Sequence, residues 1–254
     1  MTLKRVDNIR EDKPNHGDAE DYHTFLKNIL RHYEIRPIRD HPVEGRICYL
    51  HHDVDWSIDG ALQMAQIEAE HDVKSTYYIR PRSVYMKRAY SQIKAIEELG
   101  HEIGYHHSLL VVFFNEEGIS LETILNDNIA KLEQLGVKVE TVCAHGDPET
   151  IKEGYSNYEA FEECPPQLRK IERTSKLLSL EEHGLRAVEF LSRDCFIWDS
   201  GLDWQYSYDP YVDDWNGVPQ EWAYPEDYTL ENLSIINVEQ IILLTHPIWW
   251  RFYE

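Results

Sequence analysis

The sequence predicts a single α/β domain built on a parallel β-sheet. Its length of 254 residues fits one α/β domain of barrel size. Short β-branched and aromatic runs alternate with helical patterns, which is typical of right-handed βαβ units. Clusters of His and Asp follow most of these strand candidates, and the active sites of parallel sheets lie at the carboxyl ends of the strands. The pattern and the polar clusters therefore point to one edge of the same sheet.

The N-terminal region, residues 1–45, is expected to form an arm and a short helix ahead of the sheet. The arm is polar, and the helix over 21–32 has an apolar face. A proline-punctuated connection then leads into the first strand. We therefore expect the main barrel domain to cover residues 46–254. The apolar residues of the short helix are Phe25, Ile29 and Leu30.

The middle of the chain alternates strands and helices. Each helix candidate places apolar residues at helical spacing, and two of them end at a glycine, a favoured residue just past a helix C-terminus. Each strand candidate is a short apolar run bounded by polar or turn residues. Strands are expected over 47–55, 75–79, 101–107 and 139–144, and helices over 60–71, 89–99 and 120–136.

The pattern is less regular beyond residue 150. A stretch dense in Trp and Tyr, residues 199–228, is expected to be a loop. Aromatic side chains there suit stacking on a sugar ring, and packing of a lid over the core explains them equally well. The remaining expectations are a helix over 165–180 and strands over 187–191, 195–198 and 240–245.

Composition narrows the function classes. The chain has 46 Asp and Glu against 25 Lys and Arg, a formal net charge of −21, which disfavours binding to nucleic acid or anionic lipid. The four cysteines form no C-x-x-C pair, which argues against a zinc knuckle or a disulfide scaffold. The charged N-terminus is unlike a signal peptide, and no run approaches the about 18 apolar residues of a membrane span. We therefore expect a cytoplasmic protein.

The polar cluster at the end of the first strand is the main candidate site. In a regular strand His51, Asp53 and Asp55 point to one face and His52 to the other. A buried strand has no favourable place for such groups, so the cluster is expected to face a cavity. Two carboxylates there can divide the work of holding a cation and accepting a proton. Capping of the next helix by Asp55 and Ser57 is the alternative interpretation, but it does not need Asp53 or the histidines.

Four segments, in order along the chain, resemble the motifs of the NodB-type polysaccharide deacetylase superfamily, carbohydrate esterase family 4. The resemblance implies an irregular (β/α)7-type barrel that hydrolyses an N-acetyl, sometimes O-acetyl, group with a divalent metal. The segments are Leu-His-His-Asp-Val-Asp at 50–55, His-Glu-Ile-Gly-Tyr-His at 101–106, Trp-Asp-Ser-Gly-Leu-Asp-Trp at 198–204 and Leu-Leu-Thr-His-Pro at 243–247.

The resemblance also implies a role for each matching residue. Asp53 corresponds to the general base, Asp55 and His106 to metal ligands, and His246 to the general acid, with Asp199 orienting it. In this chemistry a Lewis acid polarises the acetyl carbonyl and activates water, a carboxylate removes the water proton, and a histidine protonates the departing amine. Zinc is the first expectation for His and Asp ligands, and cobalt, nickel or iron suit the same site.

Two departures from the family pattern matter. The two aspartates are usually adjacent, whereas Val54 separates them here, so the roles of Asp53 and Asp55 are exchangeable. The family's second ligand histidine follows the first by four residues, and this chain has Leu110 at that position, which cannot bind metal.

A replacement ligand is therefore expected. The best candidate is His145, which follows the strand over 139–144 and precedes turn residues. His51 and His107 are the alternatives. Two nitrogens and one carboxylate would leave positions open for water and substrate.

The expected function is thus a metal-dependent C–N hydrolase that removes an N-acetyl group from a small or carrier-linked amino sugar. Substrate contacts are expected from Trp204, Tyr105 and Trp249. A catalytically degenerate sugar-binding barrel, or a non-sugar amidohydrolase on the same fold, are the alternatives. The joint presence of Asp53 and His246 favours an enzyme, because a pure binder has no need for both a base and an acid.

Overall fold

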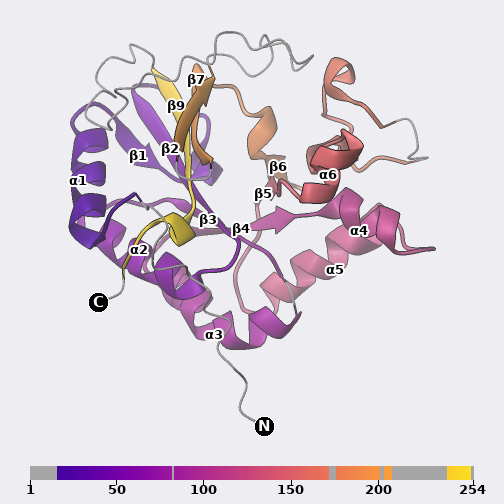
Figure 1. The fold of residues 1–254 in the computed structure, drawn as a ribbon, viewed down its shortest axis with the longest axis horizontal. Helices are drawn as coiled ribbons and strands as arrows, with labels where there is room; N and C mark the ends of the chain where they lie inside the picture. The colour runs from indigo at the N-terminus through magenta and orange to yellow at the C-terminus, as the bar shows by residue number, and fades with distance from the viewer. Residues whose placement is uncertain (1–15, 82, 172–175, 201–202, 208–238, 253–254) are drawn as a thin grey trace.

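A computed structural model describes residues 16–81, 83–171, 176–200, 203–207 and 239–252, and within them nine strands form one sheet (Figure 1). Their order is β6-β5-β4-β3-β2-β9-β7-β8, and β1 also pairs with β2. The strands are β1 Glu34–Arg36, β2 Ile47–Val54, β3 Thr76–Ile79, β4 Glu102–His107, β5 Thr141–Ala144, β6 Arg186–Ala187, β7 Cys195–Ser200, β8 Asp203–Ser207 and β9 Gln240–Thr245.

All pairs in the sheet are parallel except β7 with β8. The predicted α/β class and parallel sheet are therefore confirmed. Among the described residues the ladders run from β6 at one end to β8 at the other without joining these two strands, so the sheet is a half-barrel. Strand β9 lies between β2 and β7, with Ile47 opposite Gln240 and His52 opposite Thr245.

Helices cover the outside of this half-barrel, with α1, α2 and α3 in succession and α4 beside α5 (Figure 1). Helix α1 begins with a capping box of Asp18 and Asp21, and Ser120 caps α5. The apolar faces of the helices pack on the outer face of the sheet, and the two together form the main core. The helices are α1 Ala19–Leu30, α2 Ile58–Glu70, α3 Ser83–Glu98, α4 Leu109–Asn115, α5 Leu121–Glu133 and α6 Pro148–Glu153.

The inner face of the half-barrel has its own smaller apolar cluster. Side chains alternate along β2, so Cys48 and Leu50 lie in the main core while Ile47 and Tyr49 lie in the inner cluster. On β2 this cluster takes the side chains of the first half of the strand, and polar side chains follow on the same face at its carboxyl end. Its other buried members are Ile38, Tyr78, Cys143, Val188, Leu191 and Ile242.

The N-terminal region contributes directly to this architecture. Helix α1 packs against α2, and β1 extends the sheet by pairing with the first half of β2. The division of the chain at residue 46 stays a prediction. No helix within the described residues is long and apolar enough to cross a bilayer.

Three local predictions beyond residue 150 were wrong. The first part of the expected loop over 199–228 is strand, because β7 reaches Ser200 and β8 covers Asp203–Ser207, the two pairing as antiparallel neighbours. Within the described residues, the expected helix over 165–180 is a 3-10 turn at Pro166–Leu168, with irregular chain to residue 171 and from 176 on; residues 172–175 lie outside the described part. The reason is that side chains take the backbone bonds: Glu159 accepts the amides of Lys170 and Ile171 at 2.6 and 3.0 Å, and Arg169 donates to nearby carbonyls. Similarly, the expected strand over 187–191 shortens to β6 and continues as a 3-10 turn.

Candidate metal and catalytic site

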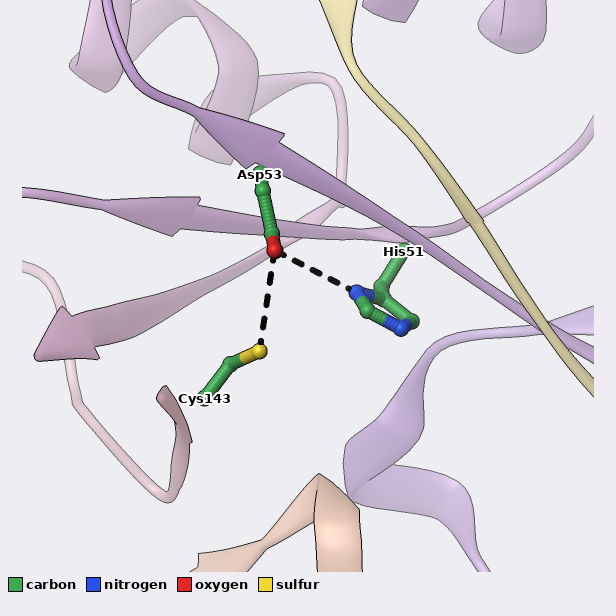
Figure 2. A group of neighbouring side chains, drawn as sticks. All are labelled: His51, Asp53 and Cys143. Atoms are coloured by element: carbon green, nitrogen blue, oxygen red, sulfur yellow. Dashed lines mark hydrogen bonds and ion pairs between the residues drawn. The ribbon is translucent and has the colours of Figure 1, made fainter. Parts of the chain in front are cut away.

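The inner face of β2 ends in His51 and Asp53, as its alternation predicts. Figure 2 shows the Asp53 carboxylate between His51 and Cys143, which comes from β5. His51 Nδ1 lies 3.5 Å from Asp53 Oδ1, and Cys143 Sγ lies 3.8 Å from Asp53 Oδ2. His52 points to the opposite face, where its Nε2 donates to Glu68 at 2.8 Å. The first aspartate of the motif is thus buried at the floor of a cavity.

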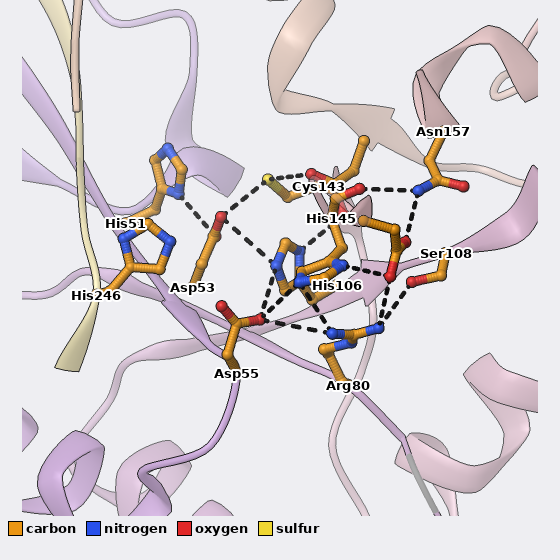
Figure 3. A network of polar contacts seen from close by, with 12 residues as sticks. His51, Asp53, Asp55, Arg80, His106, Ser108, Cys143, His145, Asn157 and His246 are labelled. Atoms are coloured by element: carbon orange, nitrogen blue, oxygen red, sulfur yellow. Dashed lines mark hydrogen bonds and ion pairs between the residues drawn. The ribbon is translucent and has the colours of Figure 1, made fainter. Parts of the chain in front are cut away.

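Asp55 meets two histidines just beyond the end of β2 (Figure 3). His106 Nε2, from β4, lies 3.5 Å from Asp55 Oδ1. His145 Nε2, from the turn after β5, lies 3.3 Å from the same oxygen. The sequence-predicted ligands therefore come together from the ends of three neighbouring strands, and their ligand atoms lie within 4.8 Å of one another.

Other contacts orient these histidines. His106 Nδ1 donates to the Cys143 carbonyl at 3.1 Å, which leaves Nε2 toward Asp55. His145 Nδ1 lies 2.8 Å from Asp147 Oδ1, and a carboxylate in that position fixes the tautomer of a ligating imidazole. Asp55 Oδ1 is buried and has no hydrogen-bond partner among the described residues. This cluster offers one carboxylate oxygen and two imidazole nitrogens, and the other nitrogen of each ring contacts a polar group that orients the ring. Such a set of donors fits a divalent cation.

Arg80 is the feature of this cluster that competes with a cation. Its Nη1 donates to His145 Nε2 at 2.9 Å and lies 3.8 Å from Asp55 Oδ1. Its Nη2 donates to Ser108 at 2.9 Å and to Asp147 at 3.3 Å. Neither Arg80 nor Asp147 was predicted to be a site residue. Their position in the sequence could have indicated them, because both lie just after the carboxyl end of a strand: Arg80 directly follows β3, and Asp147 follows β5 by three residues.

On the other side of Asp53, His246 is held by Asp199. The Nδ1 of His246 donates to Asp199 Oδ1, and its backbone amide donates to Oδ2 at 2.9 Å. Thr245 and His16 also donate to that carboxylate, at 2.6 and 3.1 Å, and neither was selected from the sequence. Burial alone would lower the pKa of His246, but Asp199, with Asp53, overcomes this and raises it to about 9. The imidazole is therefore cationic at neutral pH.

Asp53 is ionised in this environment. Burial favours its neutral form, yet interactions with His106, His51 and His246 outweigh burial and hold its pKa well below the ordinary carboxyl value. His107, one of the alternative ligands, lies away from the cavity, fully buried against Phe161. Burial lowers the pKa of His107 to about 3, so it is neutral.

A cavity of about 540 Å³ opens onto Asp53 and His246. The structure does not bring Tyr105 or Trp249 to it: Tyr105 is buried in the main core, and Trp249 lies in the turn after His246. The backbone of Trp204 lies in β8, and its side chain lies outside the described part of the chain, as do residues 208–228 of the aromatic loop. The aromatic lining residues are Tyr155, Tyr158, Phe190, Phe196 and Trp198.

Leu110, which stands where the family has its second ligand histidine, has a structural role in this protein. It is buried in α4, and its backbone amide donates to Asn157 Oδ1 at 3.0 Å. Asn157 Nδ2 in turn donates to the His145 carbonyl at 2.8 Å and to Asp147 at 2.9 Å. The helix that carries Leu110 is thereby tied to the turn that carries His145.

Comparison with known proteins gives matches among solved structures alone: no protein-family model and no curated protein matches the chain. A CE4 family pseudoenzyme from Bacillus anthracis is 16% identical over 80% of this chain and 56% of that one, with a TM-score of 0.43. A mutant of this pseudoenzyme with restored enzymatic activity is 15% identical over 80% of this chain and 57% of that one, with a TM-score of 0.43. A family 4 carbohydrate esterase from Bacillus anthracis is 16% identical over 46% of this chain and 56% of its own, with a TM-score of 0.32.

This chain thus spans little more than half of the length of these structures. They carry the name of the family whose motifs the sequence resembles. The function proposed next rests on the site residues of this chain.

Proposed function

We propose that this protein is a metal-dependent hydrolase that removes an N-acetyl group from a small or carrier-linked amino sugar. One observation supports this above the others. An ionised carboxylate, Asp53, lies at a cavity between a cluster with the donors of a metal site and a cationic His246. A base, an acid and a Lewis-acid site at one cavity are what amide hydrolysis requires.

Asp55, His106 and His145 would hold the cation. Zinc suits one carboxylate and two imidazoles, and cobalt, nickel or iron are accommodated by the same donors. When bound, such an ion supplies a Lewis acid that polarises the acetyl carbonyl and lowers the pKa of water. Without the ion, the neighbouring Asp53 and Asp55 outweigh burial and raise the pKa of His106, so a cation would compete with a proton for this ring.

Asp53 is proposed as the general base. Its carboxylate is ionised and lines the cavity, so it can accept a proton from a water that attacks the acetyl carbon. Its Oδ2 lies 3.6 Å from His106 Nε2, which keeps the base beside the proposed ligand set. Exchange of roles between Asp53 and Asp55 is disfavoured, because Asp55 is the carboxylate that contacts both histidines.

His246 is proposed as the general acid. Its Nδ1 is committed to Asp199, so the proton available to a substrate is the one on Nε2. That proton would pass to the amine nitrogen as the C–N bond breaks. Asp199 does not touch the substrate in this scheme, and its role is to position the ring and to stabilise its charge.

The cavity supports a small sugar-like substrate. Its volume of about 540 Å³ lies within the range typical of small-molecule sites. Aromatic rings form much of its wall away from the polar floor, and flat rings of this kind pack well against the apolar faces of a sugar.

Arg80 favours one alternative, a sugar-binding protein without hydrolytic activity. A guanidinium within 3.8 Å of Asp55 and 2.9 Å of His145 can neutralise the cluster without any metal. The two proposals differ in whether the purified protein takes up a cation.

The test is metal content and acetate release by the tag-free protein, compared between wild type, His106→Ala and a control away from the cavity, His32→Ala, whose side chain is partly exposed. We expect wild type and His32→Ala to bind zinc and to release acetate from N-acetylated amino sugars. His106→Ala should lose both the metal at Asp55 and the activity. Protein that takes up neither Zn²⁺, Co²⁺ nor Ni²⁺ and releases no acetate would contradict the proposal in favour of the binding protein.

A further inference from the structure

We propose a second cation site, formed by His51, Asp53 and Cys143 and adjacent to the Asp55 cluster (Figure 2). It goes beyond the proposed function, which needs one cation and assigns no role to His51 or Cys143. The site would take a thiophilic divalent cation such as zinc, cobalt or cadmium.

The spacing of the three side chains suits a tetrahedral ion. Metal bonds of about 2.0 to 2.3 Å place two ligands of a tetrahedral centre roughly 3.3 to 3.8 Å apart. His51 Nδ1 and Asp53 Oδ1 are 3.5 Å apart, and Cys143 Sγ and Asp53 Oδ2 are 3.8 Å apart. The ligand atoms of all three residues lie within 4.8 Å of one another. An ion can therefore bind with small side-chain adjustments.

The buried, unpaired imidazole of His51 is the main evidence for a bound ion. Its side chain is 0% exposed, yet neither ring nitrogen has a hydrogen-bond partner among the described residues. The rings of Tyr78 and Phe196 pack against it, and the Tyr78 hydroxyl is committed to Thr141. Asp53 Oδ1 is buried without a partner as well. Buried polar atoms in native proteins are nearly always paired, so two such atoms facing each other indicate an ion between them.

The site is reachable from solvent. His51, Asp53 and Cys143 all line the cavity described above, which provides an entry path. Three protein ligands leave one tetrahedral position open toward that cavity, where water can complete the coordination.

The donor set selects the cation. One sulfur, one nitrogen and one carboxylate favour zinc and its thiophilic analogues, whereas magnesium and calcium prefer oxygen ligands throughout. The Cys143 thiol binds as a thiolate, so its proton is released to the solvent when the ion enters. No oxidant or other co-reactant is required.

Asp53 would be a ligand of the second site and lies beside the first. Its Oδ2 lies 3.6 Å from His106 Nε2 and 3.8 Å from Cys143 Sγ, so this carboxylate stands between both ligand sets (Figure 3). An ion on His51 and Cys143 would occupy the lone pairs that the general base needs. On the basis of the proposed function, we therefore expect filling of the second site to inhibit hydrolysis.

The test titrates the reduced, metal-free, full-length protein with Co²⁺ and follows two signals. Equilibrium dialysis with mass spectrometry counts bound ions, and near-ultraviolet absorption reports thiolate-to-cobalt charge transfer. Wild type should bind two equivalents and develop the charge-transfer band. Cys143→Ala should bind one and lack the band, whereas the matched control Cys164→Ala, which removes another buried thiol, should behave as wild type.

His51→Gln separates the site from any general effect of losing a thiol, and it should also lose the second equivalent. Asp55→Asn should lose the other equivalent and keep the band. A wild type that binds a single ion without the band, or a band that persists in Cys143→Ala, would overturn the second site. Neither result depends on hydrolytic activity, so failure of the proposed function would be recognised separately, by the absence of acetate release from protein loaded with one ion.

Discussion

Strand β2 sends His51 into the cavity and His52 to the helix-covered face, and both imidazoles are fully buried. On the helix side, His52 Nε2 donates to Glu68 at 2.8 Å, and the same carboxylate accepts hydroxyl hydrogen bonds. On the cavity side, His51 has no hydrogen-bond partner within the described chain. The hydroxyl donors to Glu68 are those of Tyr22 at 2.5 Å, Ser75 at 2.6 Å and Tyr77 at 2.8 Å.

The difference shows how to separate structural from functional buried charges. Burial raises the pKa of Glu68, but His52 and the other donors outweigh it and lower it to about 2, so its charge is fully compensated. Such a network ties α1, α2, β2 and β3 together and gives both oxygens of Glu68 a hydrogen-bond donor. Asp53 and His51 are equally buried, but some of their polar atoms stay unpaired, which a protein retains where something else is to bind.

Removing the charge of Asp53, on the cavity side, should lower the catalytic rate and affect the stability of the fold much less. In Asp53→Asn we expect a decrease in kcat of roughly 10²- to 10⁴-fold, the contribution typical of a general base. The melting temperature should change less than in Glu68→Gln, because Asp53 Oδ1 has no hydrogen-bond partner among the described residues and the amide keeps the size of the side chain. Steady-state kinetics and thermal unfolding measure the two effects. If Asp53→Asn instead loses the ion at Asp55 along with its activity, Asp53 is a ligand and the base is elsewhere.

Removing the charge on the helix side should do the opposite. In Glu68→Gln the donors of the network lose their anion, and breaking a buried pair typically lowers the free energy of unfolding by about 3 to 5 kcal/mol. Activity per folded molecule should remain close to wild type. Urea unfolding measures the loss, and Glu70→Gln, at an exposed position two residues along α2, is the control. A Glu68→Gln variant as stable as the control would mean that the two faces of β2 do not differ in this way.

The smallest expected effect is on the pH profile. The pKa of His246 is raised to about 9, so the acid form predominates at neutral pH and kcat/KM should fall as the pH rises through about 9. The same sign holds for stability: the contribution of the His246 and Asp199 pair is fully present below the ordinary histidine pKa of 6.5 and is lost through about 9. Asp199→Asn removes the main anion, so its alkaline limb should move to lower pH. An unmoved limb in Asp199→Asn would remove His246 from the mechanism.

Sequence periodicity was sufficient for the part of the fold that carries the site. The predicted strands and helices between residues 47 and 144 follow simple repeats of apolar residues, and the structure has each of them, although α3 begins at Ser83, earlier than expected, and α4 Leu109–Asn115 was not predicted. The segment after Leu168 could not be predicted in that way. There a carboxylate of Glu159 and the guanidinium of Arg169 take the backbone bonds that a helix would use, and such contacts have no period in the sequence.

The candidate site was predictable where a motif coincides with a strand end and not elsewhere. Alternation correctly separates His51 from His52, and applied to β4 it also places Tyr105 on the face opposite His106, away from the cavity. Arg80 reaches His145 with a long side chain from a different strand, so its contribution depends on the three-dimensional arrangement. The same holds for His16, whose distance from Asp199 in the chain conceals their contact.

The position of β9 between β2 and β7 also has a consequence for synthesis. Because Gln240–Thr245 pairs along β2, the ribosome must deliver almost the whole chain before β2 gains that partner and before His246 reaches Asp199. At roughly 5 to 20 residues per second, the earlier strands wait on the order of ten seconds with that edge of β2 unpaired. Contacts between residues so distant in sequence also slow folding. The nascent protein therefore completes its site only when β9 pairs with β2, and until then this unpaired edge of β2 can pair with a strand of another chain.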